Sequence, residues 1–319
     1  MNIVFHGANA QTFMPQFETL LEQDHQISFV PDQIDSAANI ATYQAADIVI
    51  GIRYDASLPQ LNARLYQLPS AGYDKVDLNA LPATCEAANV FGHERAIAEY
   101  VMMALLSRHV PLFEADQQLR QRNWHYWAGK PTGLRTELGS ETIGIVGHGH
   151  IGQEIAKRAQ AFGMQVMMAN RSPIDVQYNK SFSLENLSQM AAEVDILVNC
   201  LPLTPATESM IDAKIFDAMK ADAVFVNVGR GAVADEQDLF NALKNGDIGS
   251  AIIDTWYQYP SPDNANPTPS VLPFAELNNV LMTPHMSGWT DGTIARRQRQ
   301  MADNINRLAR GEAICNSLK

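Results

Sequence analysis

One short segment, residues 147–152 with the sequence Gly-His-Gly-His-Ile-Gly, limits the possible folds of this chain more than any other feature. An apolar run over residues 142–146 leads into it, and a helical pattern over residues 153–159 follows it. In this context the first glycine permits a tight turn, the second lets the backbone approach a pyrophosphate, and the third lets the helix pack closely against the strand. The helix also begins with unpaired N–H groups that suit an anion. The pattern predicts a dinucleotide site in which five residues contact the cofactor, namely Gly147, Gly149, His150, Ile151 and Gly152.

The end of the next predicted strand, residues 165–169, indicates which dinucleotide binds. About 20 residues after the glycine turn, NAD-binding chains carry an acidic residue for the ribose hydroxyls. This chain has Asn170, Arg171 and Ser172 instead. A neutral residue, a cation and a hydroxyl suit a 2′-phosphate, which a carboxylate would repel. We therefore predict that NADP(H) is preferred and that NAD(H) is possible, against the alternative that Arg171 is only a solvated surface residue.

The composition argues against several classes of partner. Among the 319 residues, 23 are basic and 35 are acidic, and the net charge of −12 argues against nucleic acid or an anionic membrane surface as the main partner. A small anionic substrate would then need a locally positive pocket. No stretch approaches the ~20 apolar residues of a membrane span, and the first residues lack the pattern of a secretion signal. The three cysteines are widely spaced, which predicts no disulfide framework, no metal site and a reducing, cytoplasmic location.

The order of apolar runs predicts two α/β units. Short strands at 3–5, 27–30, 48–50 and 65–68 alternate with helical segments in the first unit. Helical segments follow from about residue 94 and over 113–121, and further strands come at 196–200, 224–228, 251–253 and 280–282. A last helix over 291–311 can pack back on the first unit. We predict an α/β fold of two doubly wound parallel-sheet domains, with a Rossmann cofactor domain (residues 97–287) inserted into a discontinuous, flavodoxin-like substrate domain (residues 1–96 and 288–319).

Polar residues follow several strands of the second unit, and ligands of open α/β sheets bind at the carboxyl ends of the strands. Arg230 follows the run 224–229, and a guanidinium can hold a carboxylate through two hydrogen bonds. His285 follows the last strand and can exchange a proton at neutral pH. Cys200 and Pro202 follow a third strand and Asp254 a fourth, so we count them among the cofactor contacts. Taken singly, an arginine after a strand is as often part of a surface ion pair as it is functional, and a lone histidine is usually structural. Cys200 is better explained as a small buried residue.

Four motifs in this order resemble those of the D-isomer-specific 2-hydroxyacid dehydrogenase family, which includes glyoxylate/hydroxypyruvate reductases, phosphoglycerate dehydrogenases and formate dehydrogenases. They are a substrate loop at residues 70–77, the cofactor turn at 147–152, an arginine motif at 227–231 and a histidine motif at 283–285. The resemblance covers nearly the whole chain. It implies two doubly wound domains with the cofactor domain inserted, and a homodimer joined through the region of residues 97–121.

The resemblance also implies a role for each motif. Arg230 would bind the substrate carboxylate and polarise the C2 oxygen, and His285 would exchange a proton with that oxygen. Backbone N–H groups near Ala71 and Gly72 would hold the carboxylate, while hydride passes between C2 and the nicotinamide ring. The expected activity is reduction of a small 2-oxoacid to the 2-hydroxy acid.

Two positions depart from the family pattern. Where the family has a glutamate that pairs with the histidine, this chain has Tyr259. Formate dehydrogenases of the family carry glutamine there, and a tyrosine hydroxyl can accept the imidazole N–H, although it stabilises the charged ring less than a carboxylate does. We therefore include Tyr259 in the catalytic group. Many relatives have an asparagine near the substrate where this chain has His93 and Glu94, and we take His93 as a substrate contact and Glu94 as the start of a helix.

Two alternative functions stay open at this point. The missing carboxylate at position 259 is compatible with a formate- or phosphite-type dehydrogenase. It is also compatible with a non-enzymatic interaction protein that senses the cofactor, as the family's C-terminal-binding-protein corepressors do. The presence of both Arg230 and His285 speaks against that second class.

Overall fold

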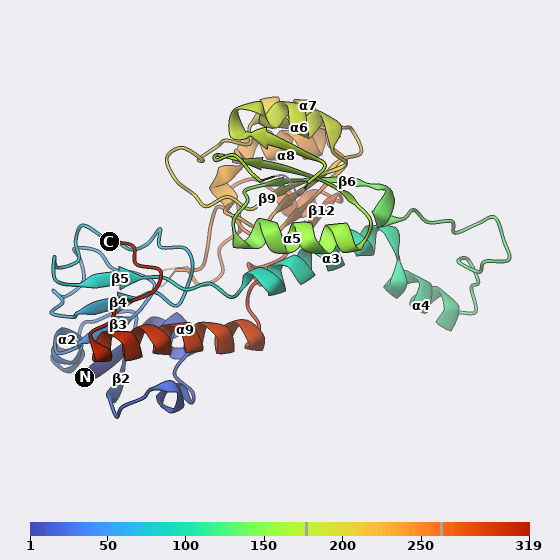
Figure 1. Cartoon of the computed structure of the whole chain (residues 1–319). Helices are drawn as coiled ribbons and strands as arrows, with labels where there is room; N and C mark the ends of the chain where they lie inside the picture. Colours follow the sequence, from blue (N-terminus) through green and yellow to red (C-terminus); the bar gives the residue numbers. More distant parts are fainter. Residues whose placement is uncertain (176–177, 262–263) are drawn as a thin grey trace. The chain divides into compact units, whose positions relative to one another are not determined.

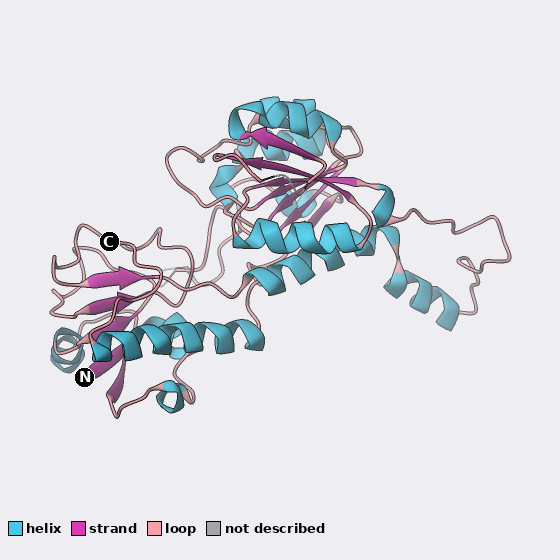
Figure 2. Ribbon diagram, in the orientation of Figure 1, coloured by secondary structure: helices cyan, strands magenta, loops and turns pink. Residues whose placement is uncertain are grey.

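The computed structural model describes residues 1–175, 178–261 and 264–319, which divide into two compact units (Figure 1). Unit 1 consists of Met1–His93 and Trp289–Lys319, and unit 2 consists of Glu94–Gly288. Each unit is built on its own parallel β-sheet with helices packed against it (Figure 2). The predicted fold class, two doubly wound α/β domains, is therefore confirmed.

Unit 1 has a five-stranded sheet in the order β2-β1-β3-β4-β5, so the strand order reverses between β1 and β3. Every printed pairing of its strands is parallel, and Ile3 of β1 lies opposite Ile27 on one side and Ile48 on the other. Its elements are β1 (Asn2–His6), α1 (Gly7–Gln11), η1 (Phe17–Leu20), β2 (Gln26–Val30), α2 (Ala37–Gln44), β3 (Ile48–Ile50), β4 (Leu65–Gln67), β5 (Glu86–Ala88) and α9 (Asp291–Arg310).

The helix α9 covers one face of this first sheet although it comes from the far end of the sequence. It begins where the Thr290 side chain accepts the N–H of Thr293, and it ends at Gly311, whose φ of +73° a glycine adopts without strain. Met301 and Ile305 of the helix pack in one cluster with alternate side chains of β1. This burial makes the chain after residue 288 part of the same hydrophobic core as the first strand.

Unit 2 has a seven-stranded parallel sheet in the order β12-β11-β10-β9-β6-β7-β8, and the strand order reverses between β6 and β9. Its helices are α3 (Glu94–His109), α4 (Leu112–Arg120), η2 (Leu138–Ser140), α5 (His150–Ala161), η3 (Leu184–Asn186), α6 (Leu187–Glu193), α7 (Ala213–Ala218), η4 (Gly231–Val233), α8 (Glu236–Asn245) and η5 (Phe274–Glu276). Its strands are β6 (Thr142–Val146), β7 (Gln165–Asn170), β8 (Lys180–Ser183), β9 (Ile196–Asn199), β10 (Val224–Asn227), β11 (Ser250–Ile253) and β12 (Val280–Met282).

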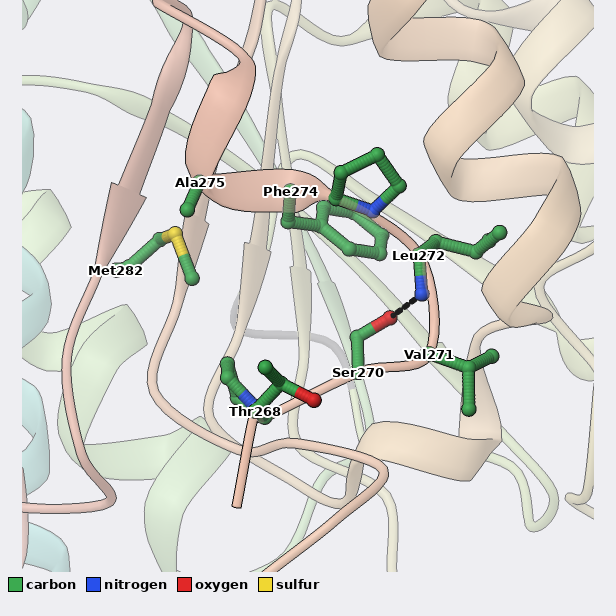
Figure 3. Close-up of a pocket in the computed structure, with 9 residues that line it drawn as sticks. Thr268, Ser270, Val271, Leu272, Phe274, Ala275 and Met282 are labelled. Carbon is green, nitrogen blue, oxygen red and sulfur yellow. Dashed lines mark hydrogen bonds between the residues drawn. The ribbon is translucent and has the colours of Figure 1, made fainter. Parts of the chain in front are cut away.

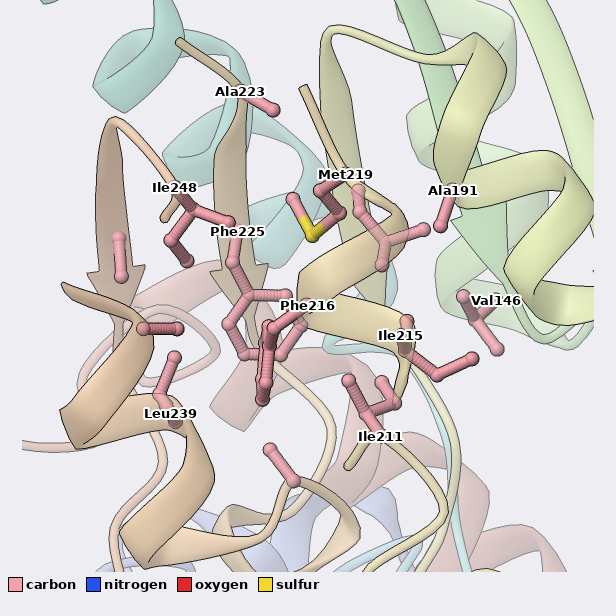
Figure 4. Packing of buried hydrophobic residues seen from close by; sticks show 14 of the residues in the cluster. Val146, Ala191, Ile211, Ile215, Phe216, Met219, Ala223, Phe225, Leu239 and Ile248 are labelled. Atoms are coloured by element: carbon pink, nitrogen blue, oxygen red, sulfur yellow. The ribbon is translucent and has the colours of Figure 1, made fainter. Parts of the chain in front are cut away.

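Helices cover both faces of the second sheet. On one face α3 and α5 pack against Ile143 and Ile145 of β6. On the other face α6, α7 and α8 pack around Leu197 and Phe225, and Figure 4 shows this cluster. There the rings of Phe216 and Phe225 meet edge to face with centroids 5.4 Å apart. Because both faces are buried, the central strands are continuous apolar runs rather than alternating ones.

Two strands were not predicted from the sequence, and both lie at a sheet edge. β5 has the sequence Glu-Ala-Ala, and β8 has the sequence Lys-Ser-Phe-Ser. Neither contains the β-branched residues that mark the central strands. An edge strand needs fewer apolar side chains, because it has a single neighbour and is partly exposed, so its pattern in the sequence is weak.

The segment after α3 is the most exposed part of unit 2. None of the residues of α4 is buried, and Figure 1 shows α4 and the loop after it extending away from the rest of the unit.

Within the described residues no helix combines the length and the apolar character that crossing a bilayer requires. The described part also contains no group of three or more His, Cys, Asp or Glu side chains arranged to hold a metal ion.

Candidate functional site

The predicted site residues of unit 2 gather at one edge of the seven-stranded sheet, because every strand of a parallel sheet ends on the same side. Each follows or ends a different strand: Gly147 follows β6, Asn170 ends β7, Cys200 follows β9, Arg230 follows β10, Asp254 follows β11 and His285 follows β12. The reversal of strand order between β6 and β9 places the glycine turn at the point where open α/β sheets bind their ligands.

The glycine turn has the geometry that a dinucleotide requires. Gly147 has a φ of +107°, and its N–H donates to the Ala169 carbonyl at 2.8 Å. A Cβ on Gly152 would lie 2.0 Å from the Gly147 carbonyl oxygen, so only glycine fits there. A Cβ on Gly149 would meet no atom of the described chain within 4 Å. Two of the three glycines are thus required by the protein itself, and Gly149 leaves open space for an approaching ligand.

The helix α5 begins at the open side of this turn. Its first residue, His150, is exposed, while Ile151 packs against the apolar cluster under the sheet. No side chain of the described residues caps the helix at Gly149. The positive end of the α5 dipole therefore lies at Gly149, where it suits an anion.

The residues at the end of β7 differ in how they are held. The Asn170 side chain accepts the His148 N–H at 3.2 Å and donates to the Ser172 carbonyl at 3.1 Å, so it fixes the turn beside the glycines. Arg171 and Ser172 are exposed. Arg171 makes no hydrogen bond or ion pair with any described residue. Its guanidinium is therefore available to bind an anion from solution.

The turn after β9 packs directly on the glycine turn. A Cβ built on Gly147 would lie 3.2 Å from the Leu201 side chain and 3.5 Å from the Cys200 carbonyl. The Cys200 N–H donates to the Val146 carbonyl at 2.9 Å. Burial raises the pKa of the Cys200 thiol above its usual range. The carbonyl of the exposed Pro202 accepts the Thr207 hydroxyl at 2.7 Å. Cys200 therefore stays a neutral thiol. This agrees with the predicted role of lining the cofactor site and not with a role as a nucleophile.

Arg230 lies between two glycines that the packing requires. A Cβ on Gly229 would lie 2.6 Å from the Leu201 carbonyl oxygen, and one on Gly231 would lie 2.4 Å from that of Trp256. Arg230 is half-buried, and its Nη1 donates to the Gly229 carbonyl at 3.0 Å. The tight packing on both sides fixes the backbone from which the guanidinium extends.

A buried polar network behind Arg230 was missed in the sequence. The Asn227 amide oxygen accepts from the Asn199 amide at 2.9 Å and from the Thr255 hydroxyl at 3.1 Å, and the Asn227 amide donates to the Arg230 carbonyl at 3.2 Å. All three polar side chains are at most 1% exposed. The network ties together the ends of β9, β10 and β11. A polar residue ending a buried apolar strand is the pattern that would have identified Asn199 and Asn227.

The loop that carries His285, residues 283–287, is held by one buried carboxylate. Asp254 is 0% exposed and accepts from the Thr283 hydroxyl at 2.6 Å, the Met286 N–H at 2.9 Å and the Ser287 N–H at 3.0 Å. His285 has a φ of +57°, which costs a non-glycine residue roughly 1–2 kcal/mol. The Asp254 contacts on both sides of His285 maintain this conformation. Asp254 was predicted to contact the cofactor; in this structure its buried carboxylate supports the loop.

Tyr259 lies beside His285. The two ring centroids are 5.5 Å apart at an interplanar angle of 53°. The Tyr259 hydroxyl accepts the Trp256 N–H at 3.0 Å, and Trp256 in turn donates its indole N–H to the Thr283 carbonyl at 2.8 Å. The side chain that replaces the family's glutamate therefore shares its support with the histidine loop.

The predicted substrate loop, residues 70–77, lies in unit 1. The Ala71 carbonyl accepts from the Asn89 amide at 2.8 Å, and the Gly72 carbonyl accepts from the Ser70 hydroxyl at 2.8 Å. Among the described residues, the N–H groups of Ala71 and Gly72 have no acceptor, and both residues are partly exposed. The loop thus offers two adjacent backbone donors. His93, the other predicted substrate contact, is the last residue of this unit before α3 and is half-buried.

An apolar pocket of about 200 Å³ lies elsewhere in unit 2 (Figure 3). Its walls come from residues 268–275 and from Met282 at the end of β12. Inside it the Ser270 hydroxyl accepts the Leu272 N–H at 2.9 Å and donates to the Glu236 carboxylate at 2.5 Å, which anchors the proline-rich loop. The predicted catalytic and cofactor residues lie outside this pocket.

Comparison with known proteins agrees with this arrangement. A family model for the NAD binding domain of D-isomer specific 2-hydroxyacid dehydrogenases matches residues 100–287. The glyoxylate reductase/hydroxypyruvate reductase of Homo sapiens is 34% identical over 225 residues, which cover 70% of this chain and 66%, just under two thirds, of the human protein. The glyoxylate reductase of Aeropyrum pernix is 30% identical over 311 residues, covering 93% of this chain and 84% of that protein.

A solved structure has the same fold over the whole chain. A D-isomer specific 2-hydroxyacid dehydrogenase family protein from Aeromonas salmonicida superposes with a TM-score of 0.82 at 25% identity, covering 100% of this chain and 98% of that one. These matches confirm the resemblance that the four motifs indicated. The chain, with its glycine turn, arginine and histidine at one sheet edge, belongs to the D-isomer specific 2-hydroxyacid dehydrogenase family of nicotinamide-dependent oxidoreductases.

Proposed function

We propose that this protein reduces a small 2-oxoacid to the 2-hydroxy acid and that it prefers NADPH. The observation that carries the proposal is that Arg230 and His285 follow β10 and β12, the two neighbours of β11, at the edge that also holds the glycine turn. A 2-oxoacid has a carboxylate next to a carbonyl. Its reduction requires a fixed cation for the carboxylate and a proton donor for the carbonyl oxygen, and this sheet edge holds both.

The residues divide the work as follows. The Arg230 guanidinium holds the substrate carboxylate and polarises the C2 oxygen. His285, in its protonated form, donates its proton to the C2 oxygen as the alkoxide forms. When bound, the reduced nicotinamide supplies the hydride that adds to C2. The products are the 2-hydroxy acid and the oxidised cofactor, so one proton and one hydride are consumed in each turnover.

The preference for NADPH rests on the end of β7. The exposed Arg171 and the hydroxyl of Ser172 follow a neutral asparagine, where an acidic residue would repel a 2′-phosphate. The space above Gly149 and the uncapped start of α5 fit the pyrophosphate of either dinucleotide. We expect kcat/KM to be at least tenfold higher with NADPH than with NADH, which corresponds to about 1.4 kcal/mol.

Steady-state turnover decides between the candidate reactions. NADPH and NADH are each supplied with glyoxylate, hydroxypyruvate and phenylpyruvate, and the reverse assay supplies formate and phosphite with the oxidised cofactors. Turnover of the 2-oxoacids supports the proposal. Turnover of formate or phosphite alone, with which Tyr259 at the family's glutamate position is compatible, would contradict the proposal and identify a formate- or phosphite-type dehydrogenase. Cofactor binding without any turnover identifies a sensing protein instead.

We further propose a homodimer that forms through α4 and the loop after it. The segment exposes large apolar side chains that a monomer would leave in water: Leu112, Phe113, Leu119, Trp124, Trp127 and Leu134. Sedimentation equilibrium should give twice the mass of the chain. The three cysteines are free, and they support a reducing, cytoplasmic location as part of the same proposal.

A further inference from the structure

A tyrosine from α3 reaches the loop that carries His285. The Tyr100 hydroxyl lies 2.7 Å from the Thr283 hydroxyl oxygen, across 183 positions of sequence. The Thr283 hydroxyl donates to the Asp254 carboxylate at 2.6 Å. Three polar side chains from three separate elements therefore form one continuous chain that ends at the histidine loop.

The direction of these hydrogen bonds follows from the chemistry of the three groups. Asp254 accepts from Thr283, so the only hydrogen of the Thr283 hydroxyl is used in that bond. Tyr100 must then donate to the Thr283 oxygen. Burial, the largest cause, raises the pKa of Tyr100. The hydrogen bond with Thr283 lowers the pKa and the negative charge of Asp254 raises it, and the net direction is upward, so the tyrosine keeps its proton and stays a donor.

We propose that Tyr100 and Thr283 are positioning residues that hold His285, through Asp254, in the conformation from which it donates its proton. The inference rests on the proposed function, because it assigns their effect to the proton donor. Asp254 binds the loop on both sides of His285, and Tyr100 connects that binding to α3.

The position of Tyr100 on α3 gives this contact its importance. The buried face of α3, with Ile97 and Val101, packs in the same cluster as Ile155 and Ala159 of α5, the helix that begins at the glycine turn. The helix α3 therefore packs against α5 through its apolar face and contacts the histidine loop through the Tyr100 hydroxyl. Removing that hydroxyl should let His285 leave its left-handed conformation more often, while the binding surfaces for cofactor and substrate remain intact.

The test compares Tyr100→Phe, Thr283→Val, Thr283→Ser and the double variant Tyr100→Phe/Thr283→Val in 2-oxoacid reduction. Tyr100→Phe should lower kcat about three- to tenfold and change both KM values less than twofold, because one hydrogen bond is lost. Thr283→Val should lower kcat at least as much, and Thr283→Ser should recover most of the rate. The double variant should match Thr283→Val alone, because Tyr100 has then already lost its acceptor.

Two further variants separate this inference from the proposed function and from simple destabilisation. Tyr257→Phe removes another half-buried tyrosine hydroxyl, which donates to the Ala234 carbonyl at 3.0 Å, and should leave kcat unchanged. His285→Gln should abolish turnover, and retained turnover would overturn the proposed function itself. If His285→Gln is inactive but Tyr100→Phe keeps kcat within twofold, or if the Tyr100 and Thr283 effects add, the positioning role is wrong. An equal loss of kcat in Tyr257→Phe would also overturn it.

Discussion

The two sheets of this chain end their first strands in turns that look alike and differ in what fills them. In unit 1 the chain passes from β1 directly into α1, whose first residue, Gly7, has a φ of +86°, and in unit 2 the turn between β6 and α5 contains Gly147 with a φ of +107°. Each turn lies where the strand order reverses and leads into a helix. In unit 1, however, a Cβ on Gly7 would lie 2.4 Å from the Asp32 carboxylate, which accepts the Ala8 N–H at 3.0 Å.

This difference shows what distinguishes a nucleotide site from a turn of the same topology. In unit 1 a carboxylate of the protein occupies the position of an anion, and the helix after it, α1, has only five residues. In unit 2 the space at Gly149 is open, and α5 has twelve residues and no side-chain cap within the described chain. The parallel sheet creates the location in both units, and of the two turns the second has open space for a ligand at Gly149.

The largest effect should come from the chemistry at the edge of the second sheet. Replacing Arg230 with alanine leaves the substrate carboxylate without its bidentate partner, so kcat/KM should fall on the order of a hundredfold or more. Arg230→Lys should recover part of the loss, since it keeps the charge but not the planar fork. Steady-state kinetics with the best 2-oxoacid measure both. Turnover near that of the unsubstituted protein in the alanine variant would show that the carboxylate is bound elsewhere.

A pair of glycine substitutions tests the comparison of the two turns directly. Gly149→Ala should lower the affinity for both NADPH and NADH at least tenfold. It should leave the thermal midpoint unchanged, because the methyl group meets only space that the pyrophosphate would use. Gly7→Ala should lower the thermal midpoint and leave the affinity for both cofactors unchanged, because its Cβ meets Asp32 and its φ is positive. Calorimetry and fluorescence titration of the cofactors separate the two effects. A lower thermal midpoint with normal cofactor affinity in Gly149→Ala would remove the proposed difference between the turns.

A smaller and selective effect is expected at the end of β7. Arg171→Ala should lower kcat/KM for NADPH about tenfold and leave NADH almost unchanged, because only NADPH carries the 2′-phosphate. Lys157→Ala serves as a control that removes one positive charge from α5 of the same unit. Equal losses for the two cofactors would show that Arg171 does not contact the 2′-phosphate.

The sequence predicted the features that depend on local pattern. The glycine turn, the apolar central strands and the polar residues after them follow from side-chain period and from turn chemistry, which act within a few residues. The edge strands β5 and β8 were missed because their pairing depends on a distant neighbour and not on their own apolar content. Element order alone placed Arg230 and His285 at one edge, since parallel strands share their direction.

The supporting groups could not be predicted in the same way. Asp254 was predicted to contact the cofactor because it follows a strand, but its support of the histidine loop was not predicted, because its three donors come from residues 283–287, some 30 positions later. The bond between Tyr100 and Thr283 spans still more of the chain. Such contacts depend on how helices pack on the sheet, and a single sequence contains no direct record of that packing.

The smallest expected effect is a shift of pH dependence at Tyr259, whose ring lies against that of His285. Reduction requires the protonated imidazole, and a carboxylate beside it stabilises that form more than a phenol does. Tyr259→Glu should therefore extend the alkaline limb of the kcat/KM profile to higher pH. Tyr259→Phe should change the profile little, because the hydroxyl accepts the Trp256 N–H and the ring contact remains. Profiles measured between about pH 5 and 10 for the three proteins decide the question. An unchanged alkaline limb in Tyr259→Glu would mean that position 259 does not influence protonation of His285, and would reduce Tyr259 to a packing residue beside the loop.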